Sequence, residues 1–456
     1  MKKKTGFLGT EKISKLLLNQ AGPTVIGFLV MTLYHLVDMI FVGKGVGTLA
    51  IAGLGIVFPV QMIIMAVSQS IGVGIASIIS RGLGANKQKL TEKALGNFFS
   101  MMLISGVVIT VLGLLFIDPL LTLFGVTPEI YTYAHDYMNI VLFGSLFICI
   151  AAGGNNIIRA EGSAKAAMLT MVIGAIVNLI LDPIFIFGMD MGVKGAALAT
   201  VIAQFCSAAY ALWFFLSNRS HVRLYFSNLR LNLTIVKESL AIGSSAAARQ
   251  ISVSVIAIVL NHSLVFYGGA VAIAALGIVS RMFMILWMPM FAISLGLMPI
   301  VGYNYGAKKL SRAKEAIILA IKWNTGLALF AFVIFIIFAR QIFGVFSNDS
   351  ALIDMGVRAT RIIALLFPVI GYHIVAGSVY QSLGKAKPAF ILSILRQVIL
   401  LVPFVLLLPL FFGLDGIWIA YPVSDGLAFV ITWLMLRRQM RTFEEKKNGR
   451  KIPVLQ

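Results

Sequence analysis

The sequence has few charged residues and almost no cysteine. Only 12% of its 456 residues are charged, whereas 59% are hydrophobic and the mean hydropathy is +0.97. Because a soluble domain is about 25% charged, this composition leaves too few polar groups to cover a soluble surface. The two cysteines, Cys149 and Cys206, lie within apolar runs, which excludes a disulfide framework and a CxxC motif. The chain is therefore predicted to be a polytopic membrane protein.

Features of several other classes are also missing. The apolar runs are continuous and lack the alternation with period 2 that a membrane-spanning β-barrel requires. No nucleotide-binding loop is present, so ATP is not expected as an energy source, and no cofactor is expected. The first apolar run, about 13–42, is too long for a signal peptide and is not closed by an A-x-A site. It is interpreted as a retained first span.

Long apolar runs fill most of the chain. A helix needs about 20 apolar residues to cross about 30 Å of hydrocarbon. Twelve runs qualify, at about 14–42, 51–80, 94–117, 131–158, 166–188, 193–216, 238–266, 271–300, 314–338, 354–383, 389–411 and 416–436. The sequence thus predicts an all-α membrane protein with twelve transmembrane helices.

Basic residues fall mainly on one side of these spans. The formal net charge is +20, and 29 of the 37 lysines and arginines lie in the two tails and in every second connection. By the positive-inside rule, both termini are expected in the cytoplasm and the chain in the cell (inner) membrane. Nucleic acid is not an expected partner, because these basic residues sit in short gaps between apolar runs.

The chain matches itself at a shift of about 222 residues. Gly53–Val57 recurs as Ala275–Val279, and Gly162–Lys165 recurs as Gly384–Lys387. Each half holds six spans, so both halves enter the membrane from the same side, related by a pseudo-two-fold axis along the membrane normal. The predicted parts are an N-lobe at 1–216, an inter-lobe linker at 217–237, a C-lobe at 238–436 and a basic tail at 437–456. Such duplication is typical of transporters with a site near mid-membrane; a channel scaffold is the alternative. A monomer is expected.

Three acids lie inside spans, where an ionisable group costs several kcal/mol and is by default a functional candidate. They are Asp38 in span 1, Asp182 in span 5 and Asp425 in span 12, which has no obvious partner. At about 1.5 Å of rise per residue, Asp38 and Asp182 lie about 8–9 Å below the outer ends of their spans. The two acids of the first half are therefore expected at one level.

Other polar residues are expected at the same level. Tyr137 in span 4 and Thr200 in span 6 lie at similar depth, and Asn178 shares a helix face with Asp182 four residues later. These oxygens suit a proton or a small hard cation such as Na⁺, and two desolvated carboxylates are expected to bind a proton as a pair. The alternative is that the groups merely satisfy one another across helices.

The second half has no matching acids. The residues 222 positions after Asp38 and Asp182 are Leu260 and Phe404, so ion coupling is expected in the first half only. The second half instead carries three arginines within its spans, Arg249, Arg281 and Arg396.

Two smaller features complete the polar inventory of the spans. Pro23 interrupts span 1 and removes a backbone hydrogen bond, which predicts either a static kink or a hinge. Glu161 stands close to Arg159 at the end of span 4, where an ion pair is expected.

Three stretches together resemble the multidrug and toxic compound extrusion (MATE) family, over nearly the whole chain: Leu36–Gly43, Asn178–Pro183 and Gly195–Thr200. The resemblance implies export of organic, often cationic, compounds driven by inward H⁺ or Na⁺. It implies a cation site, including Na⁺ ligation, at Asp38, Asn178, Asp182 and Thr200 with Tyr137 beside it, and a bend at Pro23. It further places Tyr34, Asn155, Met171 and Gln204 near a drug cavity. The chain departs from family members with acids in spans 7 and 10, because it has Arg249 and His373 there.

The leading hypothesis is therefore a drug antiporter driven by H⁺ or Na⁺, with both ions fitting the residues equally. Its expected partners are small organic drugs or toxic compounds and membrane lipids. One alternative is a flippase for a lipid-linked saccharide, for which Arg249, Arg281 and Arg396 would form a cationic cavity. A membrane-embedded enzyme with paired aspartates is a remote alternative, because neither Asp38 nor Asp182 lies in a GxGD-type loop.

Overall fold

The structure, a computed structural model, describes residues 6–447. Lys2, Lys3 and Lys4 of the basic N-terminus and residues 448–456 of the predicted tail lie outside the described residues. Within 6–447 the chain is helical throughout, with turns and short irregular connections and no strand. This confirms the all-α prediction.

The described residues form two compact units. Unit 1 comprises those within Met1–Phe7 and Gly22–Gly243, and unit 2 comprises those within Leu8–Ala21 and Ser244–Gln456. Two helices contribute to both units: α1 (Ile13–Gly45) changes unit after Ala21, and α9 (Leu233–Gly306) changes unit after Gly243. The lobe limits predicted from the sequence, 1–216 and 238–436, instead place all of α1 in the N-lobe and α9 from residue 238 onward in the C-lobe.

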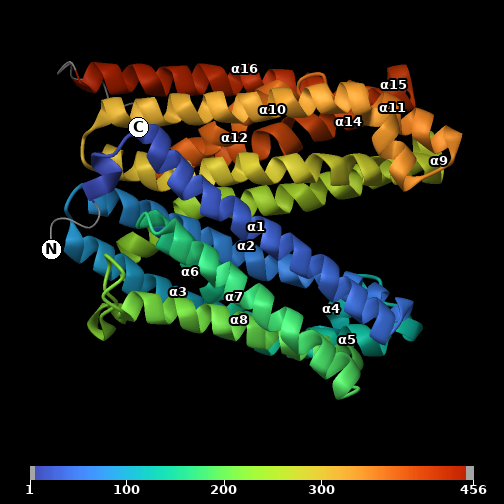
Figure 1. Cartoon of the computed structure of the whole chain (residues 1–456), viewed down its shortest axis with the longest axis horizontal. Coiled ribbons are helices and arrows are strands. Elements are labelled where there is room, and N and C mark those ends of the chain that lie inside the picture. The colour runs from blue at the N-terminus through green and yellow to red at the C-terminus, as the bar shows by residue number, and fades with distance from the viewer. Residues whose placement is uncertain (1–5, 448–456) are drawn as a thin grey trace. The chain divides into compact units, whose positions relative to one another are not determined.

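Unit 1 is a helical bundle in which α2 packs against α3, α5 and α6, while α8 packs against α5, α6 and α7 (Figure 1). Besides its parts of α1 and α9, it contains α2 (Thr48–Gly84), α3 (Gln88–Leu115), α4 (Ile117–Leu123), α5 (Pro128–Phe143), α6 (Ser145–Ala160), α7 (Ala164–Pro183), the π-helical η2 (Ile184–Gly188), α8 (Gly192–Leu216) and the 3₁₀ turn η3 (Phe226–Leu229).

Unit 2 is a second bundle, in which α12 packs against α10 and α16. Besides its parts of α1 and α9, it contains α10 (Leu310–Phe346), α11 (Ser350–Ala364), α12 (Phe367–Ser382), α13 (Ala386–Ile394), the π-helical η4 (Leu395–Leu401), α14 (Val402–Leu407), α15 (Pro409–Phe412) and α16 (Leu414–Lys447). The short 3₁₀ turn η1 (Gly6–Gly9) precedes α1. Phe335, Phe367 and Trp418 are buried at the centre of unit 2.

The helices account for all twelve predicted runs. Among the described residues, nine helical segments are long and apolar enough to cross a membrane. One of them, α9, consists of two helices joined at Gly269, whose φ of 61° is readily adopted only by glycine. Two bent pairs, α5 with α6 at 59° and α11 with α12 at 53°, each form one broken span. The nine helical segments, the second helix within α9 and the two broken spans together make twelve.

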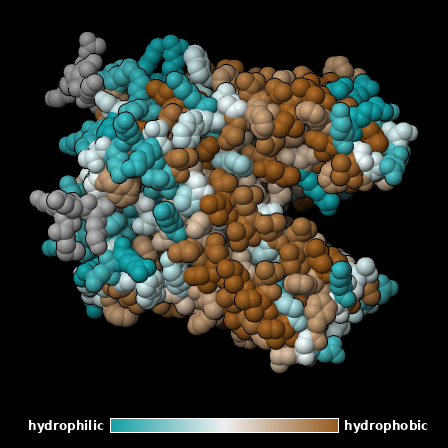
Figure 2. All heavy atoms as spheres, viewed as in Figure 1, coloured by the Kyte–Doolittle hydropathy of each residue, from teal (hydrophilic) through white to brown (hydrophobic). Residues whose placement is uncertain are grey.

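Large apolar side chains cover the sides of the helices. Leu18, Leu33, Phe266 and Ile285 are each more than 60% exposed. Figure 2 shows hydrophobic residues gathered along the helices and hydrophilic residues gathered toward their ends. Such surfaces would be unfavourable in water and are what a lipid-facing helix requires, so the chain is a multi-pass membrane protein.

The two changes of unit lie at equivalent positions of the internal repeat. Ala21 and Gly243, the last residues before the two changes of unit, are 222 positions apart. Gly74 and Gly296 are also 222 positions apart, and each allows the exchanged helix end of its unit to approach closely. A Cβ at Gly296 would lie 2.9 Å from the backbone nitrogen of Ala21, and one at Gly74 would lie 2.0 Å from the carbonyl oxygen of Ser239. Each half therefore places the first turns of its first helix in the bundle of the other half.

Glu161 helps to fasten the connection between α8 and α9 within unit 1. Its carboxylate accepts hydrogen bonds from Ser220 Oγ at 2.8 Å and from the His221 backbone nitrogen at 2.7 Å. Burial raises the pKa of Glu161 to about 8. The expected ion pair with Arg159 is wrong for the described residues, because Arg159 instead donates to Asn155.

The close contact at Gly243 gives a stability prediction. A Cβ at this position would lie only 1.7 Å from the carbonyl oxygen of Ser70. Gly243→Ala is therefore expected to lower the free energy of unfolding by about 1–3 kcal/mol or more, as overpacking does, measured as a lower melting temperature in detergent. Gly55→Ala in α2 is the matched control, because a Cβ there meets nothing within 4 Å. Equal melting temperatures for the two variants would contradict the close contact.

Candidate cation site

Four helices of unit 1 bring the five predicted cation-site residues together. Asp38 lies on α1, Tyr137 on α5, Asn178 and Asp182 on α7, and Thr200 on α8. Pro183 ends the regular helix directly after Asp182, and the π-helical turn η2 follows. Such irregular turns are frequent at functional sites.

The two carboxyl groups meet. Asp38 and Asp182 lie within hydrogen-bonding range of each other, and two carboxylates this close repel each other unless a proton or a cation is bound. Asn178 Nδ2 donates to Asp182 Oδ1 at 3.3 Å and reaches Thr200 Oγ1 at 3.5 Å. The amide thus joins the carboxylate of α7 to the hydroxyl of α8.

Tyr137 on α5 completes the cluster of polar side chains at this site. Its hydroxyl accepts a hydrogen bond from Gln61 Nε2 of α2 at 3.3 Å and also bonds to the side chain of Thr200. Gln61 was not among the predicted residues. Its signal in the sequence is an uncharged amide inside the second apolar run, which is weaker than that of an acid.

Three oxygens at this site have no donor. Asp38 Oδ1, Asn178 Oδ1 and Asp182 Oδ2 are buried and accept no hydrogen bond from the described residues. A buried acceptor without a partner costs about 1–3 kcal/mol. The arrangement therefore fits a proton, or a small cation that prefers oxygen ligands, held by Asp38, Asn178, Asp182 and Thr200.

The residues expected near a drug cavity separate into two groups. Tyr34 lies one turn before Asp38 on α1, and its hydroxyl interacts electrostatically with Asp38 and Asp182. Gln204 lies one turn after Thr200 on the same face of α8. Both therefore adjoin the cation site.

Asn155 and Met171 lie elsewhere in unit 1. Asn155 Nδ2 donates to the Thr170 hydroxyl at 2.6 Å, and its oxygen accepts from Arg159. The Met171 sulfur packs against Gly27 of α1, 2.8 Å from where a Cβ of that glycine would be. The structure thus does not bring these two residues to the carboxylates.

Pro23 lies where α1 changes unit. It follows Ala21 by two residues, and α1 stays helical from Ile13 to Gly45 across it. The part of α1 that belongs to unit 1 and carries Asp38 therefore begins one residue before the proline, and the hinge there stays a prediction.

In unit 2, Asp425 is not alone, which corrects the expectation from the sequence. Arg396 Nε donates to Asp425 Oδ1 at 2.5 Å, and the guanidinium also lies 5.7 Å from the ring centre of Trp287. Arg396 belongs to the π-helical turn η4. Arg249 lies 5.0 Å from the ring centre of Phe291.

Twelve spans, an internal duplication and a buried pair of carboxylates together are typical of secondary transporters. Comparison with known proteins makes the class specific. The model of the MatE family matches twice, at residues 23–184 and 246–407. The chain belongs to the MatE family, and the two matches confirm the internal duplication predicted from the sequence.

Similar proteins are known across nearly the whole length. The chain is 25% identical to a FAD transporter of Shewanella oneidensis over 96% of this chain and 97% of that protein. It is 26% identical to the multidrug export protein MepA of Staphylococcus saprophyticus, over 95% and 96%. A solved structure of the MATE multidrug transporter DinF-BH in complex with R6G is similar at a TM-score of 0.88 and 41% identity, covering 95% and 98%.

Proposed function

We propose that this chain exports organic, cationic or amphiphilic drugs in exchange for H⁺ or Na⁺. Its membership of the MatE family and its similarity to multidrug exporters support drug export. The observation that carries the ion coupling is the set of buried oxygens without donors on Asp38, Asn178 and Asp182. No enzymatic step and no cofactor belong to this proposal. The protein acts as a monomer in the inner membrane with both termini in the cytoplasm.

The coupling follows from the charge of the carboxylate pair. A bound H⁺ or Na⁺ removes the repulsion between Asp38 and Asp182, so the part of α1 after Pro23 approaches α7. When the cation leaves, the two anionic groups repel each other and attract a cationic drug, with Tyr34 and Gln204 beside them. Cation and drug therefore stabilise different conformations, and each promotes release of the other.

Transport in inverted membrane vesicles tests this proposal. A pH gradient that is acidic inside the vesicle should drive uptake of a cationic dye without sodium if the coupling ion is H⁺. If it is Na⁺, a sodium gradient should drive uptake at equal pH on both sides. Dye uptake that neither gradient changes, in vesicles containing the folded protein, would count against antiport.

A saccharide-lipid flippase is the alternative, and one observation weakens it. Of the three arginines that would form its cationic cavity, Arg396 is already neutralised by Asp425, and Arg281 is exposed on the surface. Deletion of the gene distinguishes the two functions. Loss of drug resistance with an intact cell wall supports the exporter, and a cell-wall defect supports the flippase.

A further inference from the structure

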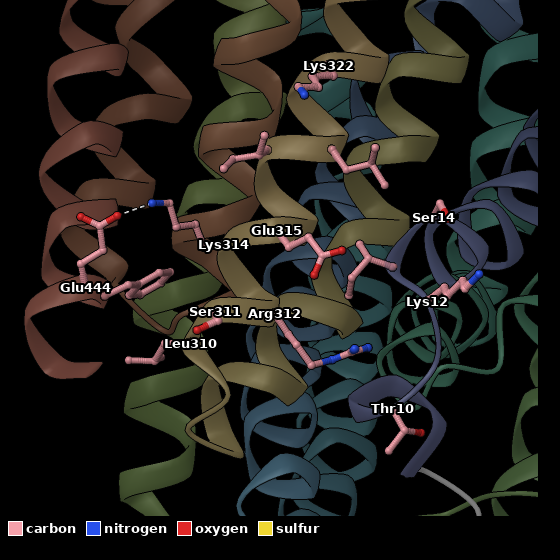
Figure 3. Close-up of a pocket in the computed structure, with 14 residues that line it drawn as sticks. Thr10, Lys12, Ser14, Leu310, Ser311, Arg312, Lys314, Glu315, Lys322 and Glu444 are labelled. Carbon is pink, nitrogen blue, oxygen red and sulfur yellow. Dashed lines mark hydrogen bonds and ion pairs between the residues drawn. The ribbon is translucent and has the colours of Figure 1, made fainter. Parts of the chain in front are cut away.

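A pocket of about 770 Å³ opens at the basic end of unit 2 (Figure 3). All of its lining residues belong to unit 2. They come from the residues just before α1, the start of α1, the first turns of α10 and the end of α16. The charge distribution of the sequence predicts that this end faces the cytoplasm, at the level of lipid headgroups.

Positive charge dominates the lining. Four basic residues, Lys12, Arg312, Lys314 and Lys322, face two acids, Glu315 and Glu444. Lys314 is paired with Glu444, and Figure 3 shows it turned away from the side chain of Arg312. The side chains of Lys12 and Lys322 have no hydrogen-bond or ion-pair partner in the part of the chain that the structure describes.

Arg312 has an unused donor at the pocket. Its Nη2 donates to the backbone oxygen of Glu11, which fixes the guanidinium beside the start of α1. Its Nε is buried and donates to no acceptor among residues 6–447. A buried guanidinium N–H without an acceptor is costly and suits an oxyanion, for which arginine geometry is well matched.

The rest of the lining is apolar. Ile13, Leu310, Ile318, Leu319 and Phe443 form its walls. Ile318 is 38% exposed, and Leu18, four residues after Ser14 on the same face of α1, is 62% exposed. Exposed apolar side chains thus lie beside the pocket on both α1 and α10, which suits a ligand with both an anionic group and hydrocarbon.

The internal repeat supplies a comparison within the same molecule. The residues 222 positions before Leu310, Lys314 and Lys322 are Gln88, Glu92 and Ser100 of unit 1. There the chain itself occupies the corresponding place. Gln88 donates to the His221 carbonyl at 3.0 Å, and Ser100 donates to the Leu229 carbonyl at 2.5 Å.

Unit 2 thus differs from unit 1 in the charge of the side chains at these equivalent positions. It also differs in whether the chain itself fills the space beside them. In unit 1, uncharged side chains bind the linker through its carbonyls. In unit 2, basic side chains surround a pocket, and the residues that precede Gly6 include Lys2, Lys3 and Lys4, which carry charge of the same sign. With four basic and two acidic lining residues, the pocket keeps a net positive charge that an anion from outside the chain can neutralise.

We propose that this pocket binds the phosphate of an anionic phospholipid, with Arg312 and Lys12 around the phosphate and the acyl chains along Ile318 and Leu18. Basic pockets between membrane helices are suited to anionic headgroups. Because Arg312 also holds the backbone at Glu11, the bound lipid fastens the start of α1 to α10. That start precedes Pro23 in the helix that carries Asp38.

Lipid binding to the purified full chain tests this proposal, by native mass spectrometry with added phosphatidylglycerol. Each basic residue near an anionic headgroup contributes about 1 kcal/mol, so Lys12→Gln should weaken binding about fivefold. The matched control is Lys165→Gln, an exposed lysine at the start of α7 that is not in the pocket lining. This control should bind like the wild type. Arg312→Gln should weaken binding further, but it also removes the bond to Glu11, so the Lys12 variant decides.

Two further arms identify the source of the phosphate. Phosphatidylcholine should bind at least tenfold more weakly, and millimolar inorganic phosphate should not displace phosphatidylglycerol. Equal binding of phosphatidylcholine, displacement by inorganic phosphate, or unchanged binding in the folded Lys12→Gln protein would each overturn the proposal. These results do not depend on drug transport, so they are independent of the antiporter proposal.

Discussion

Asp38→Asn or Asp182→Asn should reduce dye efflux from loaded cells by about one to two orders of magnitude. This range corresponds to a coupling free energy of about 1–3 kcal/mol. Asparagine keeps the size of the side chain but can neither release a proton nor carry the negative charge that binds Na⁺. Because the two carboxyl groups meet within hydrogen-bonding range, we expect each single variant to lose nearly as much as the double variant.

The control for these variants is Asp190→Asn. Asp190 is an exposed aspartate of unit 1 in the turn before α8, with a φ of 49° that asparagine also adopts readily. It should transport like the wild type at equal expression. Undiminished efflux in both Asp38→Asn and Asp182→Asn, with expression confirmed, would exclude this carboxylate pair as the coupling site.

The twelve spans and the level of the site could be predicted because the bilayer constrains them strongly. A fixed rise per residue converts position along a span into depth, so Asp38, Tyr137, Asp182 and Thr200 could be placed at one level without coordinates. An acid inside an apolar run is rare enough to stand out. Once the two acids are at one level, their contact requires only that α1 and α7 face each other.

Other features left no local signal. Arg396 and Asp425 are 29 residues apart on different helices, and Arg396 lies in the π-helical turn η4, which the apolar pattern does not reveal. The exchange of helix ends after Ala21 and Gly243 lies within continuous apolar patterns, so hydropathy does not reveal it. Gln61 carries no charge and is one of many polar residues in the spans.

The exchange has a consequence for the proposed transport cycle. The start of α1 packs in unit 2, whereas Asp38 at its far end contributes to the cation site of unit 1. A change in charge at Asp38 therefore acts on a helix whose first turns belong to unit 2, and Pro23, the predicted hinge, lies between those turns and Asp38. The repeat places the corresponding change of unit in α9 after Gly243.

Asp425→Asn should be the most destabilising of these substitutions outside the cation site. Asp425 is 3% exposed and its carboxylate holds the Arg396 guanidinium, which is itself largely buried. Removing one partner of a buried ion pair costs about 3–5 kcal/mol, because the other charge is left uncompensated. The measurement is the melting temperature of the purified protein in detergent, with size-exclusion chromatography to confirm that it is folded at the start.

Two further variants separate the buried pair from the mere loss of an aspartate. Asp415→Asn, in the same helix α16, breaks the exposed pair with Arg358, and surface pairs contribute only about 0–1 kcal/mol. The double variant Arg396→Met with Asp425→Leu should recover most of the stability lost in Asp425→Asn, since replacing both partners by apolar groups removes the unpaired charge. If Asp425→Asn melts like Asp415→Asn, or if the double variant is no more stable than the single one, the ion pair does not stabilise unit 2 in this way.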